Sequence, residues 1–191
     1  MDSGHISLFS IFKFIAKHPS GMRWRNTQFR PYSSLCKKLT NSIPEQSGWY
    51  FWGRFDKNSK WECIYVGRSK HTEKGWGLHH RIIDELKEER IAFWAYVVGD
   101  KKAFSDQSKA FDRKYDSSAK RALKKKGTHF IIWVSDPTVT LEGVLAEESA
   151  LVDYYKPLSN IQRVWARHKT RRTKQIIVLA DREMKKIISK K

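Results

Sequence analysis

The amino-acid sequence predicts an α+β domain, and three observations support that fold class. Two runs of aromatic and β-branched residues, 48–55 and 60–69, are separated by a polar turn and predict a β-hairpin. Residues 78–89 then carry apolar side chains at helical spacing. A second helical pattern begins after Pro137 and is terminated by Pro157. Strands combined with amphipathic helices in one short chain are typical of an α+β fold.

Two further strands and a basic insertion are predicted between these helices. The apolar runs 91–99 and 129–136 indicate a third and a fourth strand. Residues 100–127 lie between them and are polar and rich in lysine, so we predict that this insertion contacts phosphate groups without reading base sequence. Its most basic run is Lys124, Lys125 and Lys126.

Charge and cysteine content limit the classes of function. The 191 residues carry a formal net charge of +18, which points to a polyanionic partner, nucleic acid before an acidic membrane surface. Hydrophobic residues make up 40% of the chain, enough for a buried core, and no apolar run is long enough to span a bilayer. Cys36 and Cys63 provide neither a disulfide framework nor a zinc motif. We therefore expect a reducing, cytoplasmic environment and no membrane partner.

Residues 1–47 and 161–191 are predicted to be basic arms on either side of the central domain, 48–160. The first arm is expected to begin with a helix over about 5–17 that packs on the domain or on a second subunit. An organellar transit peptide is the alternative for this segment, because Arg and Ser follow it and acidic residues are scarce.

One acidic residue interrupts the apolar stripe of the second helix. At about 100° per residue, this stripe is formed by Leu141, Val144, Leu145, Leu151, Val152 and Tyr155. Glu148 falls in the middle of the stripe, whereas Glu147 falls at its edge, where its carboxylate can reach water. A carboxylate centred on a core-facing stripe is costly unless it is paired or holds a metal ion. Two interpretations are therefore open: a buried Glu paired with an Arg, and a metal ligand.

Short motifs in the central region stand in a specific order along the chain. They are Gly48-Trp49-Tyr50, Tyr65-Val66-Gly67, Arg81, Glu148 and Asn160. This ordered set resembles the GIY-YIG endonuclease family over residues 48–160. Two features depart from the family pattern: Trp49 replaces a small aliphatic residue, and the segment between the two tyrosines is somewhat long.

The resemblance implies a small antiparallel β-sheet flanked by helices, and an enzyme that hydrolyses phosphodiester bonds with a divalent metal ion. Glu148 matches the glutamate that binds the metal in this family. Mg²⁺ (or Mn²⁺) suits a single carboxylate, because it keeps several water ligands and takes others from substrate phosphate. With this match, the metal-ligand interpretation of Glu148 becomes the preferred one.

The same resemblance gives expected roles to the arginine and the tyrosines. Arg81 is expected to hold the scissile phosphate, and its alternative is a surface ion pair with Glu85 one turn further on. Tyr50 and Tyr65 match the signature tyrosines, one of which accepts the proton of the attacking water when nearby cations lower its pKa. We expect Tyr50 rather than Tyr65 to be this base, because the small Gly48 leaves room beside it for a water molecule.

Four residues close to these motifs in the sequence, and Asn160 within them, also have expected roles. Arg68 stands where several relatives carry a Lys, and we expect Arg68 and Lys70 to bind phosphate. Asn160 is expected either to tie the end of the second helix to the site or to be purely structural. His79 and His80 lie on the first helix, but their spacing does not match the histidine of the family's restriction enzymes, so a catalytic role is the weaker interpretation.

The compact chain indicates which kind of nuclease to expect. It has no room for a separate DNA-binding module and no Cys/His cluster, so it is most similar to the type II restriction endonucleases of the family. Such an enzyme cuts double-stranded DNA, and two active sites imply a homodimer or higher homo-oligomer. The alternatives are a structure-specific or degradative phage-type DNA endonuclease, and a non-catalytic nucleic-acid-binding protein with this fold.

Overall fold

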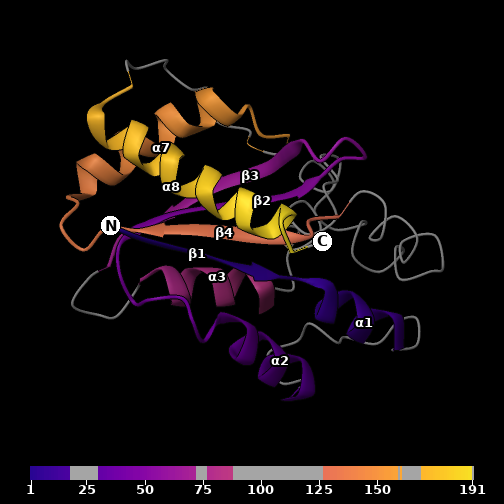
Figure 1. Cartoon of the computed structure of the whole chain (residues 1–191). Coiled ribbons are helices and arrows are strands. Elements are labelled where there is room, and N and C mark those ends of the chain that lie inside the picture. The colour runs from indigo at the N-terminus through magenta and orange to yellow at the C-terminus, as the bar shows by residue number, and fades with distance from the viewer. Residues whose placement is uncertain (18–29, 72–76, 88–126, 159, 161–168, 191) are drawn as a thin grey trace.

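The computed structural model describes residues 1–17, 30–71, 77–87, 127–158, 160 and 169–190. They form an antiparallel sheet with the strand order β1-β4-β2-β3, covered by helices (Figure 1). The strands are β1 (Asp2–Ser7), β2 (Gly48–Phe55), β3 (Trp61–Ser69) and β4 (Phe130–Ser135). The helices are α1 (Phe9–Lys17), α2 (Arg30–Thr40), α3 (Leu78–Lys87), α7 (Leu141–Tyr155) and α8 (Arg171–Ile188). The α+β class with a small antiparallel sheet is confirmed, while the predicted strand at 91–99 lies outside the described residues.

The chain begins with a strand where the sequence predicted a helix. β1 pairs antiparallel with β4, and Ile6 lies opposite Ile131. Helix α1 begins only at Phe9, so the helix predicted over 5–17 was wrong for its first four residues. The reason is tertiary: β2 occupies one edge of β4, and β1 satisfies the backbone hydrogen bonds of the other edge.

Side chains of the sheet alternate between two cores. On β2, Tyr50 and Trp52 face the core shared with α2 and α3, whereas Trp49 and Phe51 face the core shared with α7 and α8. The domain therefore has three layers, with α1, α2 and α3 on one side of the sheet and α7 and α8 on the other (Figure 1). Because both faces are covered, every residue of β2 except Arg54 is buried.

The predicted basic arms belong to this domain wherever the structure describes them. Within 1–47, β1 joins the sheet and α2 buries Tyr32 and Cys36 in the first core. Within 161–191, α8 packs on the opposite face through Ile176, Ile177, Ala180, Met184 and Ile187. The sequence did not reveal these contacts with the core, because the basic residues dominate the composition of both segments. Most lysines and arginines of α2 and α8 lie on the exposed side of an amphipathic helix. The predicted boundaries at 47 and 161 therefore do not separate arms from the core.

Helix α7 buries Glu147, which the sequence placed at a water-accessible edge. The Glu147 carboxylate accepts hydrogen bonds from the hydroxyls of Thr170 (2.7 Å) and Thr173, at the N-terminus of α8. Conversely, Leu141 and Leu145 of the predicted core stripe are 53% and 42% exposed. Helical spacing shows which residues share a face, but not that α8 covers a second side of α7, so these assignments were wrong.

Glu147→Gln is therefore expected to lower the free energy of unfolding by about 1–2 kcal/mol, because charge-assisted hydrogen bonds at the positive end of α8 are weakened. Thermal unfolding at neutral pH, followed by circular dichroism, measures this. An unchanged midpoint would contradict the structural role of this carboxylate.

Candidate active site

The β2–β3 hairpin places both signature tyrosines on one face of the sheet. Tyr50 lies opposite Gly67 and Trp52 lies opposite Tyr65, so the two tyrosines are diagonal neighbours. Their ring centroids are 6.1 Å apart. Tyr50 is fully buried, whereas Tyr65 is partly exposed.

The two glycines of the motifs are required by close packing. A Cβ on Gly67 would lie 2.3 Å from Cζ of the Tyr50 ring, which crosses β3 at that point. A Cβ on Gly48 would lie 2.2 Å from the carbonyl oxygen of Val134 and 2.7 Å from a methyl of Leu78. Each glycine thus allows a neighbour of the site to approach the strand more closely than any side chain would permit.

Trp49, which departs from the family pattern, has a clear structural role. Its indole N–H donates to the carbonyl oxygen of Val144 at 3.1 Å, and its ring is fully buried. This bond joins β2 to α7 one turn before Glu148. The departure therefore fixes the helix that carries the predicted metal ligand.

Tyr50, Glu85 and Arg81 form a hydrogen-bonded group between β2 and α3. The Tyr50 hydroxyl donates to Oε1 of Glu85 at 2.6 Å, and Nε of Arg81 lies 3.1 Å from the same oxygen. Burial, and then the Glu85 carboxylate, raise the pKa of Tyr50 well above its usual value. Burial alone would lower the pKa of Arg81, but Glu85 and Tyr50 outweigh it and raise the pKa above its ordinary range. Tyr50 is therefore held as a protonated donor in this arrangement.

The sequence foresaw the ion pair of Arg81 but missed Glu85 as a member of the site. Glu85 stands seven residues after Leu78 on the same helix face, between the buried Ile82 and Leu86, and is itself buried. This is the pattern that singled out Glu148, seven residues after the start of its own stripe. The signal was present in the sequence and would have identified a second carboxylate facing the interior.

Arg68 and Glu148 form an ion pair between β3 and α7. Nε of Arg68 donates to Oε2 of Glu148 at 2.6 Å, and the Glu148 side chain is 12% exposed. Burial raises the pKa of Glu148 above its usual value, although Arg68 and then Arg81 lower it in part. The paired-carboxylate interpretation thus describes the arrangement seen, and Arg81 is close enough to act on Glu148 electrostatically.

Asn160 contacts the backbone between Tyr65 and Gly67. Its amide N–H donates to the carbonyl oxygen of Val66 and its own oxygen accepts from the N–H of Val66, both at 2.9 Å. β3 is an outer strand of the sheet, so this side chain takes the place of a neighbouring strand. Asn160 therefore holds Tyr65 in position from outside the site.

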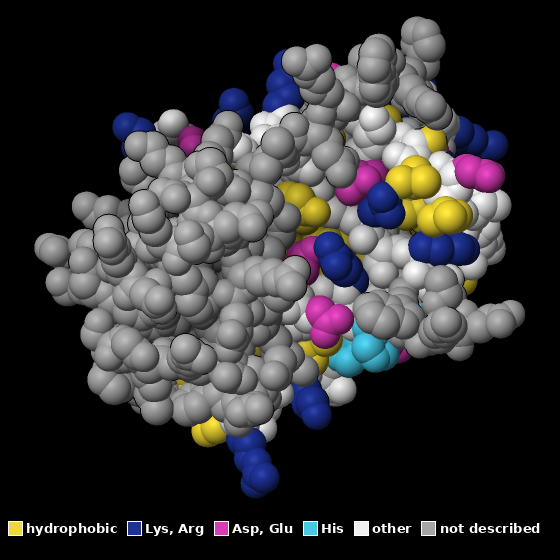
Figure 2. Space-filling view, turned by 180° about the vertical axis from the view of Figure 1, so that it is seen from behind, with side chains coloured by type: hydrophobic (Ala, Val, Ile, Leu, Met, Phe, Trp, Pro, Cys, Tyr) yellow, Lys and Arg dark blue, Asp and Glu magenta, His cyan; other side chains and the backbone are white. Residues whose placement is uncertain are grey.

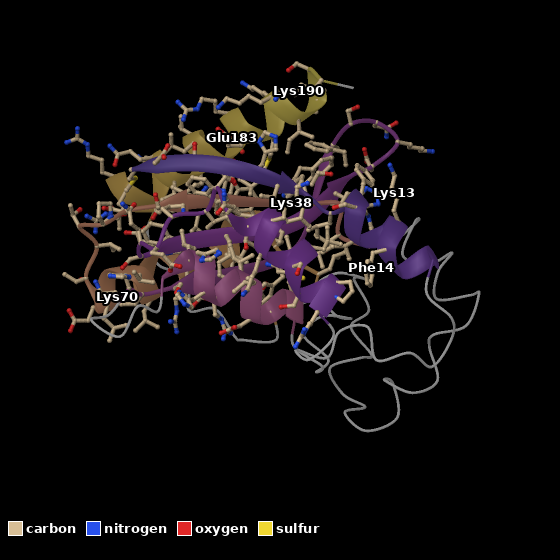
Figure 3. All side chains as sticks on the ribbon, turned by 90° about the horizontal axis from the view of Figure 1, so that it is seen from below. Lys13, Phe14, Lys38, Lys70, Glu183 and Lys190 are labelled. Atoms are coloured by element: carbon tan, nitrogen blue, oxygen red, sulfur yellow. The ribbon has the colours of Figure 1, made fainter. Side chains whose placement is uncertain are left out.

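The predicted phosphate-binding lysines divide into two groups. Nζ of Lys70 donates to the carbonyl oxygen of Val139 at 2.6 Å, in the segment that leads into α7. Lys70 lies at the end of the sheet away from Lys13 and Lys190 (Figure 3). Lys124, Lys125 and Lys126 lie outside the described residues.

No family model, curated protein or solved structure gives a significant match to this chain. The resemblance to GIY-YIG endonucleases therefore depends on the ordered motifs and on the geometry of the residues that carry them.

Proposed function

We propose that this chain is a GIY-YIG-type endonuclease that hydrolyses phosphodiester bonds of double-stranded DNA with a divalent metal ion. One observation carries the proposal: two tyrosines, two arginines and a carboxylate from β2, β3, α3 and α7 lie in one electrostatically connected cluster. Its members are Tyr50, Tyr65, Arg68, Arg81 and Glu148. Phosphodiester hydrolysis needs these components together: cations for phosphate, a metal ligand and a proton acceptor.

Glu148 fits Mg²⁺ (or Mn²⁺) only in the presence of phosphate. Burial destabilises its charged form, which a bound cation would relieve. The adjacent guanidinium groups of Arg68 and Arg81 oppose a cation until an anion neutralises them. The metal, when bound, would polarise the scissile phosphate and lower the pKa of a coordinated water. We infer that DNA and the metal bind cooperatively.

Each residue of the cluster has a corresponding task in this proposal. Arg68 would release the Glu148 carboxylate and bind the incoming phosphate instead. Its side chain is 31% exposed, so phosphate can reach it. Arg81, with 52% side-chain exposure, would hold the developing charge while Glu85 orients it. Asn160 would keep the strand that carries Tyr65 fixed as phosphate approaches. The cluster thus supplies binding, orientation and a proton acceptor.

The charge of the chain supports a polyanionic partner for the whole domain. The net charge is +18, and within the described ranges no helix has the length and apolar character needed to cross a bilayer. One active site cuts one strand, so cleavage of both strands requires two copies or two successive cuts. We therefore propose a homodimer of the restriction type as the working form.

A non-catalytic DNA-binding protein is the second candidate, and a specific observation favours it. Both arginines of the cluster already have a carboxylate partner in the same chain: Arg68 pairs with Glu148, and Arg81 pairs with Glu85. A protein that only binds DNA could keep them so and use its surface charge alone.

A plasmid digest discriminates these candidates. Purified protein is incubated with supercoiled plasmid in Mg²⁺ and, in parallel, in EDTA. We expect Mg²⁺-dependent cleavage, with discrete fragments for a restriction enzyme and a smear for a degradative one. A band shift without any cleavage would leave DNA binding alone and overturn the nuclease proposal.

A further inference from the structure

Two histidines and a glutamate converge beside the first turn of α3. Nδ1 of His79 lies 2.5 Å from Oε1 of Glu45, and Nδ1 of His80 lies 2.8 Å from Oε2 of the same carboxylate. One potential ligand atom from each residue lies within 4.8 Å of the others. Seen from behind, histidine side chains form a small surface patch next to an acidic side chain (Figure 2).

The backbone holds these three side chains in fixed relation. The backbone N–H of Leu78 donates to the carbonyl oxygen of Gln46 at 2.9 Å, and that of His79 donates to the carbonyl oxygen of Pro44 at 3.3 Å. The start of α3 is therefore hydrogen-bonded to the residues on either side of Glu45. A Cβ on Gly77 would lie 2.6 Å from the carbonyl carbon of Glu45. Gly77 therefore permits a close approach that preorganises the ligand set, as a binding site requires.

The hydrogen bonds of Thr40 determine which nitrogen of His79 faces Glu45 with a lone pair. The Thr40 hydroxyl lies 3.0 Å from the carbonyl oxygen of Cys36 and donates to it, as threonine commonly does within a helix. It then accepts from Nε2 of His79, at 3.1 Å. With the Nε2 proton so assigned, a neutral His79 would direct an Nδ1 lone pair at the Glu45 carboxylate. Nδ1 is therefore the ring nitrogen that can coordinate a metal ion together with the Glu45 carboxylate.

We propose that Glu45, His79 and His80 bind a transition-metal ion, with Zn²⁺ as the preferred occupant. Two imidazoles and one carboxylate are an established ligand set for Zn²⁺, with the remaining positions open to water. Thr40 supplies the outer hydrogen bond that ligating histidines usually have. This site is separate from Glu148 and does not depend on nuclease activity.

The arrangement needs only a small adjustment to take the ion. Tetrahedral Zn²⁺ with bond lengths near 2.0–2.1 Å separates its ligand atoms by about 3.3 Å. The two N···O distances must therefore open from 2.5 and 2.8 Å, and the exposed side chains of Glu45 and His80 can move by that amount. A bound ion would join Glu45 to α3 through His79 and His80, directly before Arg81, and so stiffen the helix that carries Arg81.

The test is equilibrium dialysis of the full chain against Zn²⁺, with a Co²⁺ absorption spectrum to report tetrahedral coordination. We expect the wild type to bind one Zn²⁺ at this site, and His80→Ala to weaken that binding by tenfold or more. Thr40→Val should also weaken it, but by less than His80→Ala does, because it removes only the outer hydrogen bond and no ligand. His80 is 52% exposed at its side chain, so its replacement should leave the fold intact.

His71→Ala and Glu148→Gln serve as matched controls, an exposed histidine outside the cluster and the proposed Mg²⁺ ligand. Both should retain the wild-type affinity for Zn²⁺, which separates this site from the nuclease proposal. The inference is overturned if the wild type takes up no Zn²⁺, or if His80→Ala binds it as tightly. Either result would mean that the three side chains are held by hydrogen bonds alone.

Discussion

Replacing Glu148 with Gln is expected to abolish Mg²⁺-dependent cleavage of plasmid DNA while leaving DNA binding intact or tighter. Gln cannot supply the anionic ligand, so the rate should fall by at least about 10²–10³-fold, the typical effect of losing one charge-stabilising group. DNA binding should persist, since Arg68 and Arg81 remain and a negative charge near phosphate is gone. Cleavage rate and electrophoretic mobility shift, measured on the same preparation, give both quantities.

The same variant should be more stable than the wild type at neutral pH. Burial raises the pKa of Glu148 in the folded state above its ordinary value of 4.5, so ionisation of this group opposes folding. Below the unfolded-state pKa both states are protonated and the penalty is absent. The penalty develops as the pH rises from the unfolded-state pKa to the raised folded-state pKa, and it is complete above the latter.

Glu148→Gln should therefore raise the unfolding midpoint at pH 7 and have little effect near pH 3. Single stabilising substitutions commonly contribute about 0.5–2 kcal/mol, and we expect a gain within that range. Glu147→Gln is the matched control one residue away and should shift the midpoint in the opposite direction. Wild-type cleavage by Glu148→Gln would contradict the metal assignment, whatever its stability.

Local patterns in the sequence were sufficient for the hairpin and for the helix that carries Glu148. The strand periodicity at β2 and β3 placed Tyr50 and Tyr65 on one face, because that relation depends only on alternation and on adjacent strands. Pro157 follows closely on the end of α7, as predicted. These features are set by residues near one another in the chain.

The remaining features depend on which elements meet in space. Pairing of Arg68 with Glu148 joins β3 to α7, and burial of Glu147 requires α8 to cover a second side of α7. The strand β1 forms because β4 offers an unpaired edge 120 or more residues away in the sequence. None of these contacts leaves a periodic signal, so the sequence could not predict which side chains pair with which.

Tyr65→Phe is expected to reduce the cleavage rate more than Tyr50→Phe, which reverses the order expected from the sequence. The room beside Gly48, on which that order depended, is filled by the backbone of β4 and by Leu78. Tyr50 is fully buried, donates to Glu85 at 2.6 Å and has a raised pKa, all of which oppose proton acceptance. Tyr65 is partly exposed and lies three residues before Arg68 on β3, where water and phosphate can reach it.

The two variants should differ in both rate and stability. Losing the general base typically costs about 10²–10⁴ in rate, so single-turnover cleavage by Tyr65→Phe at saturating Mg²⁺ should fall in that range. Between pH 6 and 10 the wild-type rate should rise with ionisation of the base, and Tyr65→Phe should lose that rise. Tyr50→Phe should keep it but unfold about 1–3 kcal/mol more easily, because Glu85 loses a buried donor. A flat profile in folded Tyr50→Phe, together with a normal one in Tyr65→Phe, would restore Tyr50 as the base and make Glu85 its proton acceptor.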